Sequence, residues 1–202
     1  MYDWPDPKVL SRWPTNEKAV LLTFDDGPSE WLPEILSILH FYHQPSTFFW
    51  LGSKIGDHLP LALLSANGHV VGTHGWQHQR MDELSEGEQW NGLTRAVQRM
   101  EQVGIPPVHW FRPPYGRYNE GTCRAARQLD LRIMHWHIAG WDWALSEEPG
   151  RIVDNVLQNV DSGSIILLHE LPQTVTALPE ILEGLVAQGY HLRVPAVRQV
   201  KV

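Results

Sequence analysis

The sequence predicts an α/β fold in which parallel strands alternate with helices, on two observations. Short apolar runs of strand length alternate along the chain with longer stretches whose apolar residues recur at helical spacing. About seven runs of the first kind and about six of the second follow one another, with no internal repeat and no linker rich in Pro, Gly or Ser. Such alternation favours parallel strands joined by crossover helices, which both a doubly wound sheet and a closed or distorted barrel satisfy. We therefore expect one domain over residues 1–202.

The predicted strands are short apolar runs that end at polar or turn-forming residues. In order, they cover Ala19–Phe24, Thr47–Leu51, His69–Thr73, Val108–Phe111, Arg132–Ile138, Ser164–Leu168 and Tyr190–Val194. Between them, apolar residues at helical spacing predict helices over about 31–42, 54–66, 85–100, 119–129, 150–160 and 175–185. The third of these helices begins with a capping box, Ser85-x-x-Glu88, and the last is followed by the stop signal Gly189.

Composition excludes several classes of protein. The chain has 202 residues, of which 43% are hydrophobic, so it can bury a full core. Lys and Arg total 16 against 23 Asp and Glu, giving a net charge of -7, which argues against nucleic acid and anionic membranes as partners. No stretch is long and apolar enough to span a membrane. The single cysteine, Cys123, excludes an intrachain disulfide and a thiolate metal site.

The N-terminal residues Met1–Asp6 lack the basic start and apolar stretch of a signal peptide. The chain as written is therefore expected to be cytoplasmic, whereas a shortened form of an exported protein would be extracellular or periplasmic. The sequence leaves the oligomeric state open.

Polar residues that could act in catalysis or metal binding follow the predicted strands. Asp25 and Asp26 follow the first strand, and further members of this set are His74, His78, Arg112, Asp142 and His169. Because the carboxyl ends of parallel strands converge on one face of a (β/α) barrel, we expect these side chains to form one site.

A metal site is indicated by two imidazoles at His74-x-x-x-His78, a spacing that lets both rings face one way in a helical turn or loop. Two His and one carboxylate suit a divalent transition metal, with zinc the first choice and cobalt or nickel compatible. The pair Asp25-Asp26 can supply both a ligand and a base, since successive side chains in a strand diverge.

At this point the motifs resemble those of the polysaccharide deacetylases of carbohydrate esterase family 4, the NodB-homology domain, from about Lys18 to Val197. In family order, the matching segments are Thr23-Phe24-Asp25-Asp26-Gly27, Gly68–His78, Arg112-Pro113-Pro114-Tyr115-Gly116, Asp142-Trp143 and Leu167-Leu168-His169. The resemblance implies a distorted (β/α) barrel and a metal-dependent hydrolase that removes N-acetyl or O-acetyl groups from a carbohydrate such as a chitooligosaccharide or peptidoglycan.

The resemblance also implies a role for each matching residue. Asp25 becomes the general base and His169 the general acid, while Asp26, His74 and His78 become the metal ligands. Arg112 would orient Asp25, Asp142 would hold the His169 ring, the Tyr115 N–H would bind the oxyanion, and Trp143 and Leu167 would wall the pocket for the acetyl methyl. Trp141 and Trp136, beside these motifs, would narrow the pocket.

The chain departs from the family pattern at two positions. Gly75 replaces the usual Ser or Thr, which predicts a looser metal loop, and Ala139 replaces an Asp, which predicts altered hydrogen bonding behind the site. Two alternatives stay open: an amidase or deformylase acting on a non-polymeric or lipid-linked amide, and a glycan-binding protein without turnover.

Overall fold

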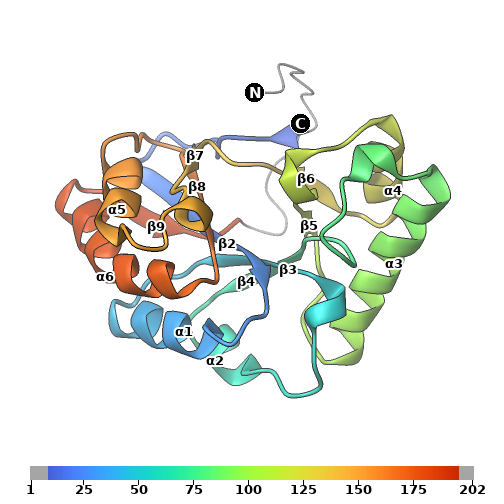
Figure 1. Ribbon diagram of the computed structural model, residues 1–202, viewed down its shortest axis with the longest axis horizontal. Coiled ribbons are helices and arrows are strands. Elements are labelled where there is room, and N and C mark those ends of the chain that lie inside the picture. The colour runs from blue at the N-terminus through green and yellow to red at the C-terminus, as the bar shows by residue number, and fades with distance from the viewer. Residues whose placement is uncertain (1–8, 196–202) are drawn as a thin grey trace.

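The computed structural model describes residues 9–195, which form a curled parallel sheet with helices packed against it (Figure 1). The strands are β1 (Val9–Leu10), β2 (Ala19–Gly27), β3 (Thr47–Trp50), β4 (Val70–Thr73), β5 (Trp110–Phe111), β6 (Arg132–Met134), β7 (Ile138–Ala139), β8 (Ile165–His169) and β9 (His191–Arg193). The α-helices are α1 (Leu32–Phe41), α2 (Leu61–Ala66), α3 (Glu86–Gln102), α4 (Glu120–Gln128), α5 (Pro149–Leu157) and α6 (Pro172–Ala187). Short 3₁₀ helices lie at Gly52–Lys54, Met81–Glu83, Pro114–Gly116 and Asp142–Ala144.

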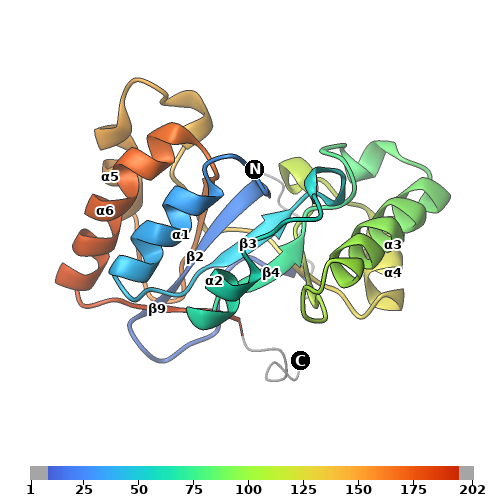
Figure 2. The same cartoon turned by 90° about the horizontal axis from the view of Figure 1, so that it is seen from below.

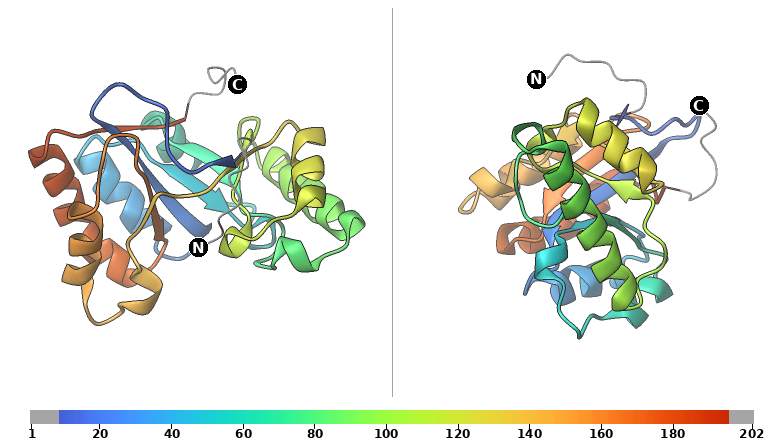
Figure 3. Two further views of the ribbon diagram at one scale, coloured as in Figure 1. Left: turned by 90° about the horizontal axis from the view of Figure 1, so that it is seen from above. Right: turned by 90° about the vertical axis from the view of Figure 1, so that its right-hand side faces the viewer.

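The sheet follows the order β1-β6-β5-β4-β3-β2-β8-β7, and β9 pairs with the start of β2. Every strand pair in it is parallel, as the crossover helices require. The eight strands of this order curl into a half-barrel, which confirms the expected distorted (β/α) barrel. Helices α1, α5 and α6 lie on one side of the strands, and α3 and α4 lie on the other (Figure 2, Figure 3).

Side-chain alternation along β2 separates the core from the site. Val20, Leu22 and Phe24 belong to the large buried cluster that includes the helix residues, whereas Leu21 belongs to a smaller cluster with Trp110 and other strand residues. Because the side-chain period of a strand is two, Thr23 and Asp25 share the face of Leu21. The inner face of the half-barrel therefore becomes polar at the carboxyl end of β2.

The prediction of one strand over Arg132–Ile138 is wrong, because this stretch forms two strands at distant places in the sheet. β6 pairs with β1 and β5, whereas β7 lies at the far edge and pairs with β8. The guanidinium of Arg112 donates to the carbonyl oxygens of Met134 and His135, at 3.1 and 2.8 Å. These two carbonyls are thereby turned toward a side chain, and the strand ends there.

Two smaller expectations also need correction. The predicted helix over residues 54–66 is shorter, since α2 begins at Leu61 directly after Pro60, and only Gly52–Lys54 before it is 3₁₀ helix. β1 was not predicted at all, because a two-residue strand has too few residues to show a period.

The capping box was predicted correctly: the Ser85 hydroxyl accepts from the Glu88 N–H, and Glu88 accepts from the Ser85 N–H. None of the helices formed by residues 9–195 is long and apolar enough to cross a bilayer. The prediction about Met1–Asp6 falls outside the described residues, as does the end of the resembling segment at Val197.

Candidate active site

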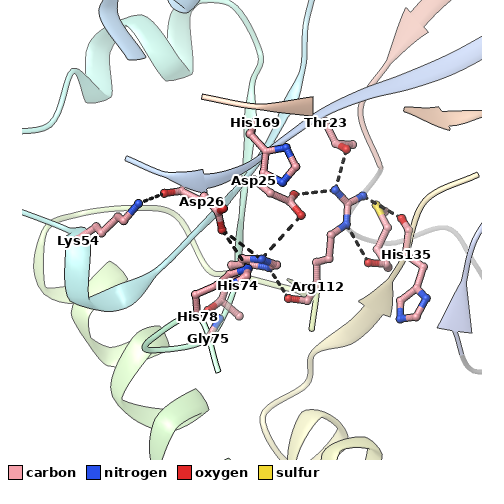
Figure 4. A network of polar contacts seen from close by, with 12 residues as sticks. Thr23, Asp25, Asp26, Lys54, His74, Gly75, His78, Arg112, His135 and His169 are labelled. Carbon is pink, nitrogen blue, oxygen red and sulfur yellow. Dashed lines mark hydrogen bonds and ion pairs between the residues drawn. The ribbon is translucent and has the colours of Figure 1, made fainter. Parts of the chain in front are cut away.

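The carboxyl end of β2 carries a β-bulge at Asp26. Asp25 and Gly27, on either side of it, pair with successive residues of β3, so Asp26 is an extra residue, with a φ of 69°. The bulge corrects the expectation that the two acids diverge. Asp25 Oδ2 lies 3.8 Å and Asp26 Oδ1 lies 3.5 Å from the same atom, Nε2 of His74 (Figure 4). Two carboxylates that adjoin in sequence therefore face one imidazole.

Asp26, His74 and His78 form a cluster whose ligand atoms all lie within 4.8 Å of one another. Asp26 Oδ1 is 3.5 Å from His74 Nε2 and 3.4 Å from His78 Nε2. The two rings come from a loop of bends after β4, not from a helical turn, and Gly75 in that loop has a φ of 85°. The three residues predicted to hold the metal are thus brought together.

The hydrogen bonding of His74 tests whether this cluster suits a cation. Its Nδ1 lies 2.6 Å from the carbonyl oxygen of Arg112, which can only accept, so Nδ1 carries the hydrogen. Burial lowers the pKa of His74 to about 3, so the ring is neutral and Nε2 presents a lone pair to Asp26 Oδ1. Within residues 9–195, that oxygen is buried without a hydrogen-bond partner. Acceptors that face one another in this way fit a divalent cation between them, in keeping with the divalent metal that the resemblance implies.

Arg112 is fully buried and joins β2 to the end of β6. Its Nη1 donates to Asp25 Oδ1 at 2.7 Å and to Thr23 Oγ1 at 2.8 Å, while its Nε and Nη2 donate to the two backbone carbonyls at the end of β6. Each nitrogen of this buried guanidinium donates a hydrogen bond, so the group is held in one position. Arg112 thereby also fixes the position of the Asp25 carboxylate (Figure 4).

The pKa of Asp25 reflects burial more than its ion pair with Arg112. Complete burial raises the pKa of Asp25 above its usual value, and this effect outweighs the lowering by the nearby cation Arg112 and by His169. A carboxylate with a raised pKa is a stronger base than an exposed one.

His169 ends β8 opposite Asp142, which follows β7. Asp142 Oδ1 lies 2.8 Å from His169 Nδ1, and its Oδ2 accepts from the His169 N–H at 2.6 Å and the Thr174 hydroxyl at 2.6 Å. Burial alone would lower the pKa of His169, but the hydrogen bond and charge of Asp142, with the charges of Asp25 and Asp26, raise it overall. The ring is therefore disposed to carry a proton.

These groups open into one cavity of about 480 Å³. It is lined by Asp25, Asp26, His74, His78, Tyr115, Trp136, Trp143, Leu167, His169 and Leu171. Trp136, Trp143 and Leu167 line this cavity, whereas Trp141 is absent from the lining. Trp141 is 54% exposed and packs on Trp143, with ring centroids 5.0 Å apart. Across the cavity, the Tyr115 ring packs on His78 at 4.3 Å, and Tyr115 has a φ of 59°.

The loop that carries His74 and His78 is held by hydrogen bonds that do not require a hydroxyl at position 75. The Thr73 hydroxyl accepts from the Gly75 N–H at 3.1 Å, and Gly52 and Ser53 donate to the carbonyls of Gly75 and Trp76 at 2.9 Å each. These bonds argue against the looser loop that was expected from Gly75. At the second departure, Ala139 pairs with Leu167 in β7–β8; its effect on the site stays a prediction.

Sequence reasoning missed several supporting residues. Thr23 bonds Arg112, and Thr174 on α6 bonds Asp142, yet each looks like an ordinary buried hydroxyl in the sequence. Glu170 was also missed: it is 3% exposed beside His169, and its position directly after a catalytic candidate was the available signal.

Comparisons with known proteins identify the family of this chain. The family model described as polysaccharide deacetylase matches residues 12–134. A peptidoglycan-N-acetylglucosamine deacetylase of Bacillus cereus is 34% identical over 92% of this chain and 91% of its own length. One of Listeria monocytogenes is 33% identical over 86% of this chain but only 37% of its own length. A solved pseudoenzyme of carbohydrate esterase family 4 from Bacillus anthracis superposes with a TM-score of 0.85 and 28% identity, covering 93% of this chain and 67% of that one.

Proposed function

Because the chain belongs to the polysaccharide deacetylase family, carbohydrate esterase family 4, we propose that it hydrolyses acetyl groups on the amino sugars of a glycan. The N-acetylglucosamine residues of peptidoglycan are the first candidate substrate, given the activities named for its relatives. The observation that carries the proposal is the meeting of Asp25, His169 and the cluster of Asp26, His74 and His78 around one cavity.

Asp26, His74 and His78 would hold the divalent metal, with zinc the first candidate and cobalt or nickel compatible. The metal supplies Lewis acidity, which makes water more acidic and polarises an acyl oxygen.

Asp25 accepts a proton from the attacking water. Its carboxylate faces the cavity from the end of β2, and Arg112 holds one of its oxygens at 2.7 Å, so the other is free to take the proton. Arg112 is a positioning residue in this scheme.

His169 donates a proton to the nitrogen that leaves. Its Nδ1 is committed to Asp142, so Nε2 is the nitrogen that exchanges a proton with the substrate. The backbone N–H of Tyr115, whose residue lines the cavity, donates to the acyl oxygen as negative charge develops there.

Trp143 and Leu167 surround the acetyl methyl, since both line the cavity beside His169. Trp141 lies at the rim, where its exposed ring offers a flat apolar face to a neighbouring sugar of the glycan.

The test is release of acetate from a panel of peptidoglycan, chitooligosaccharides, acetylxylan, monomeric N-acetyl sugars and small amides, with protein loaded with one metal per chain. We expect turnover of the glycans and loss of turnover in Asp25→Asn. Turnover of small amides alone would instead indicate an amidase. If no substrate is turned over but glycan binds tightly, the chain is a glycan-binding relative without turnover.

A further inference from the structure

Glu170 is a buried carboxylate that the proposed mechanism does not use. It directly follows His169 at the end of β8 and is 3% exposed. Its Oε1 accepts from the indole Nε1–H of Trp50 at 2.8 Å, and its Oε2 accepts from the Ser29 N–H at 2.7 Å. Burial raises the pKa of Glu170 to about 7. Burying a carboxyl group is unfavourable unless donors satisfy it, so the positions of these two donors matter.

The two donors belong to segments that adjoin the turn after Asp26, because Trp50 pairs with Gly27 across β2 and β3. Trp50 ends β3, and Ser29 lies three residues after Asp26. The backbone of Glu170 makes two more bonds to the same region: its N–H donates to the Asp25 carbonyl at 3.4 Å, and its carbonyl accepts from the Ser29 hydroxyl at 3.1 Å. Glu170 therefore contacts the chain both before and after the bulge.

Glu170 also packs directly on Gly27. A Cβ at position 27 would lie 1.8 Å from Glu170 Oε1 and 2.6 Å from a ring carbon of Trp50. The chain thus leaves no room for any side chain between the carboxylate and the turn. Gly27 follows Asp26, whose φ of 69° is sparsely populated by residues with a side chain. Such a conformation persists where surrounding contacts determine it.

We propose that Glu170 is a positioning residue that holds the turn after Asp26 in shape, so that the Asp26 carboxylate stays aimed at His74 and His78. It does so by joining the ends of β8, β3 and β2 through one carboxylate. The inference rests on the proposed function in one respect, since it takes Asp26 as a metal ligand.

The main variant is Glu170→Gln, which keeps the size of the side chain. A carboxylate accepts at both oxygens, but a glutamine amide accepts at one and must point its NH₂ at a donor, either Ser29 N–H or Trp50 Nε1–H. The turn then shifts or loses one bond. We expect the affinity for Zn²⁺, measured by competition with a chelator, to fall about 10- to 100-fold.

Two readouts separate positioning from a general loss of stability. The visible spectrum of the Co²⁺-loaded variant should differ from that of the unaltered protein, because the geometry of the carboxylate ligand changes. The thermal unfolding of the metal-free variant and its far-UV circular dichroism should show that it is folded. The matched control is Glu183→Gln on α6, whose carboxylate accepts from the Tyr42 hydroxyl in an exposed hydrogen bond; its Zn²⁺ affinity and Co²⁺ spectrum should be unchanged.

Gly27→Ala provides a second variant that alters no polar group. Its methyl would displace Glu170 from the turn and should reduce Zn²⁺ affinity, as Glu170→Gln does. If Glu170→Gln does not fold, the Zn²⁺ affinity of Gly27→Ala tests the inference instead. Unchanged Zn²⁺ affinity and Co²⁺ spectrum in the folded variants would overturn the inference while leaving the proposed function intact. Failure of the unaltered protein to bind Zn²⁺ or Co²⁺ would overturn both.

Discussion

Asp142 bonds both the backbone and the ring of His169. One carboxylate oxygen accepts from the His169 N–H at 2.6 Å, and the other lies 2.8 Å from the ring Nδ1. Because a carboxylate only accepts, Nδ1 carries a hydrogen, and the ring has one orientation in which Nε2 is free. The pairing of β7 with β8 brings the two residues together, although they are 27 positions apart in the sequence.

Replacing Asp142 with Asn should therefore impair the acid. The loss of charge lowers the pKa of His169, so its protonated form, which is present below that pKa, is lost at a lower pH than in the unaltered protein. We expect kcat to fall about 10²- to 10⁴-fold and the basic limb of the pH–rate profile to move to lower pH. Thr174→Val removes one bond to Asp142 but keeps its charge, and its basic limb should stay in place. An unmoved basic limb in Asp142→Asn would contradict the assignment of His169 as the acid.

Substitutions of Asp25 and Asp26 should have different effects on metal uptake and on kcat. Asp25→Asn retains an oxygen for Arg112, so the protein should take up one metal per chain, measured by elemental analysis, while kcat falls at least about 10²-fold. Asp26→Asn should lose metal uptake, because it removes the charged ligand between His74 and His78. If Asp26→Asn binds metal normally and Asp25→Asn does not, the roles of the two residues are reversed.

Trp141 should matter for long substrates. Removing its exposed ring by Trp141→Gly should lower kcat/KM about tenfold for oligosaccharides and leave N-acetylglucosamine unaffected, since only a longer glycan reaches the rim. Glycine also suits the φ of 61° at this position, so folding stability should not suffer. Phe41→Ala on α1, where the ring is 75% exposed, serves as the control and should change kcat/KM for neither substrate. Equal losses for both substrates would place Trp141 inside the acetyl pocket.

His69 should make the fold sensitive to acid. Burial lowers its pKa to about 4, while its Nδ1 accepts from the Ser46 N–H at 3.1 Å, so the folded state holds the neutral ring. A lowered histidine pKa gives stability that is present above the unfolded value of 6.5 and lost as pH falls toward 4. The loss amounts to at most about 3 kcal/mol. In urea unfolding at pH 7, 5.5 and 4.5, this dependence should flatten in His69→Asn, because an amide does not titrate, while its oxygen can still accept from the Ser46 N–H. The control substitution His191→Asn, at an exposed position, should leave the pH dependence of stability unchanged.

Local patterns were enough to predict much of the fold and which residues meet at the ends of the strands. Strand-length apolar runs predicted β2, β3, β4 and β8, and a capping box predicted the start of α3, because alternation and caps act over a few residues. The metal cluster followed from residue types at the ends of these strands, since parallel strands converge at that edge.

Other features depended on contacts that no local pattern contains. The stretch Arg132–Ile138 reads as one strand, yet Arg112 takes two of its carbonyls and divides it between distant places in the sheet. The bulge at Asp26 likewise arises from pairing with β3. Burial raises the pKa of Asp25 although a cation adjoins it, and burial is a property of the whole packed chain.

The sequence by itself determined which chemical groups this protein has and that they lie at the ends of parallel strands. Tertiary structure decided how they face one another: that Asp25 and Asp26 meet the same nitrogen of His74, and that the tautomer of His74 leaves a lone pair for a cation. Residue type and strand order are encoded over short stretches, whereas distance, burial and hydrogen-bond partners depend on segments that only folding brings together.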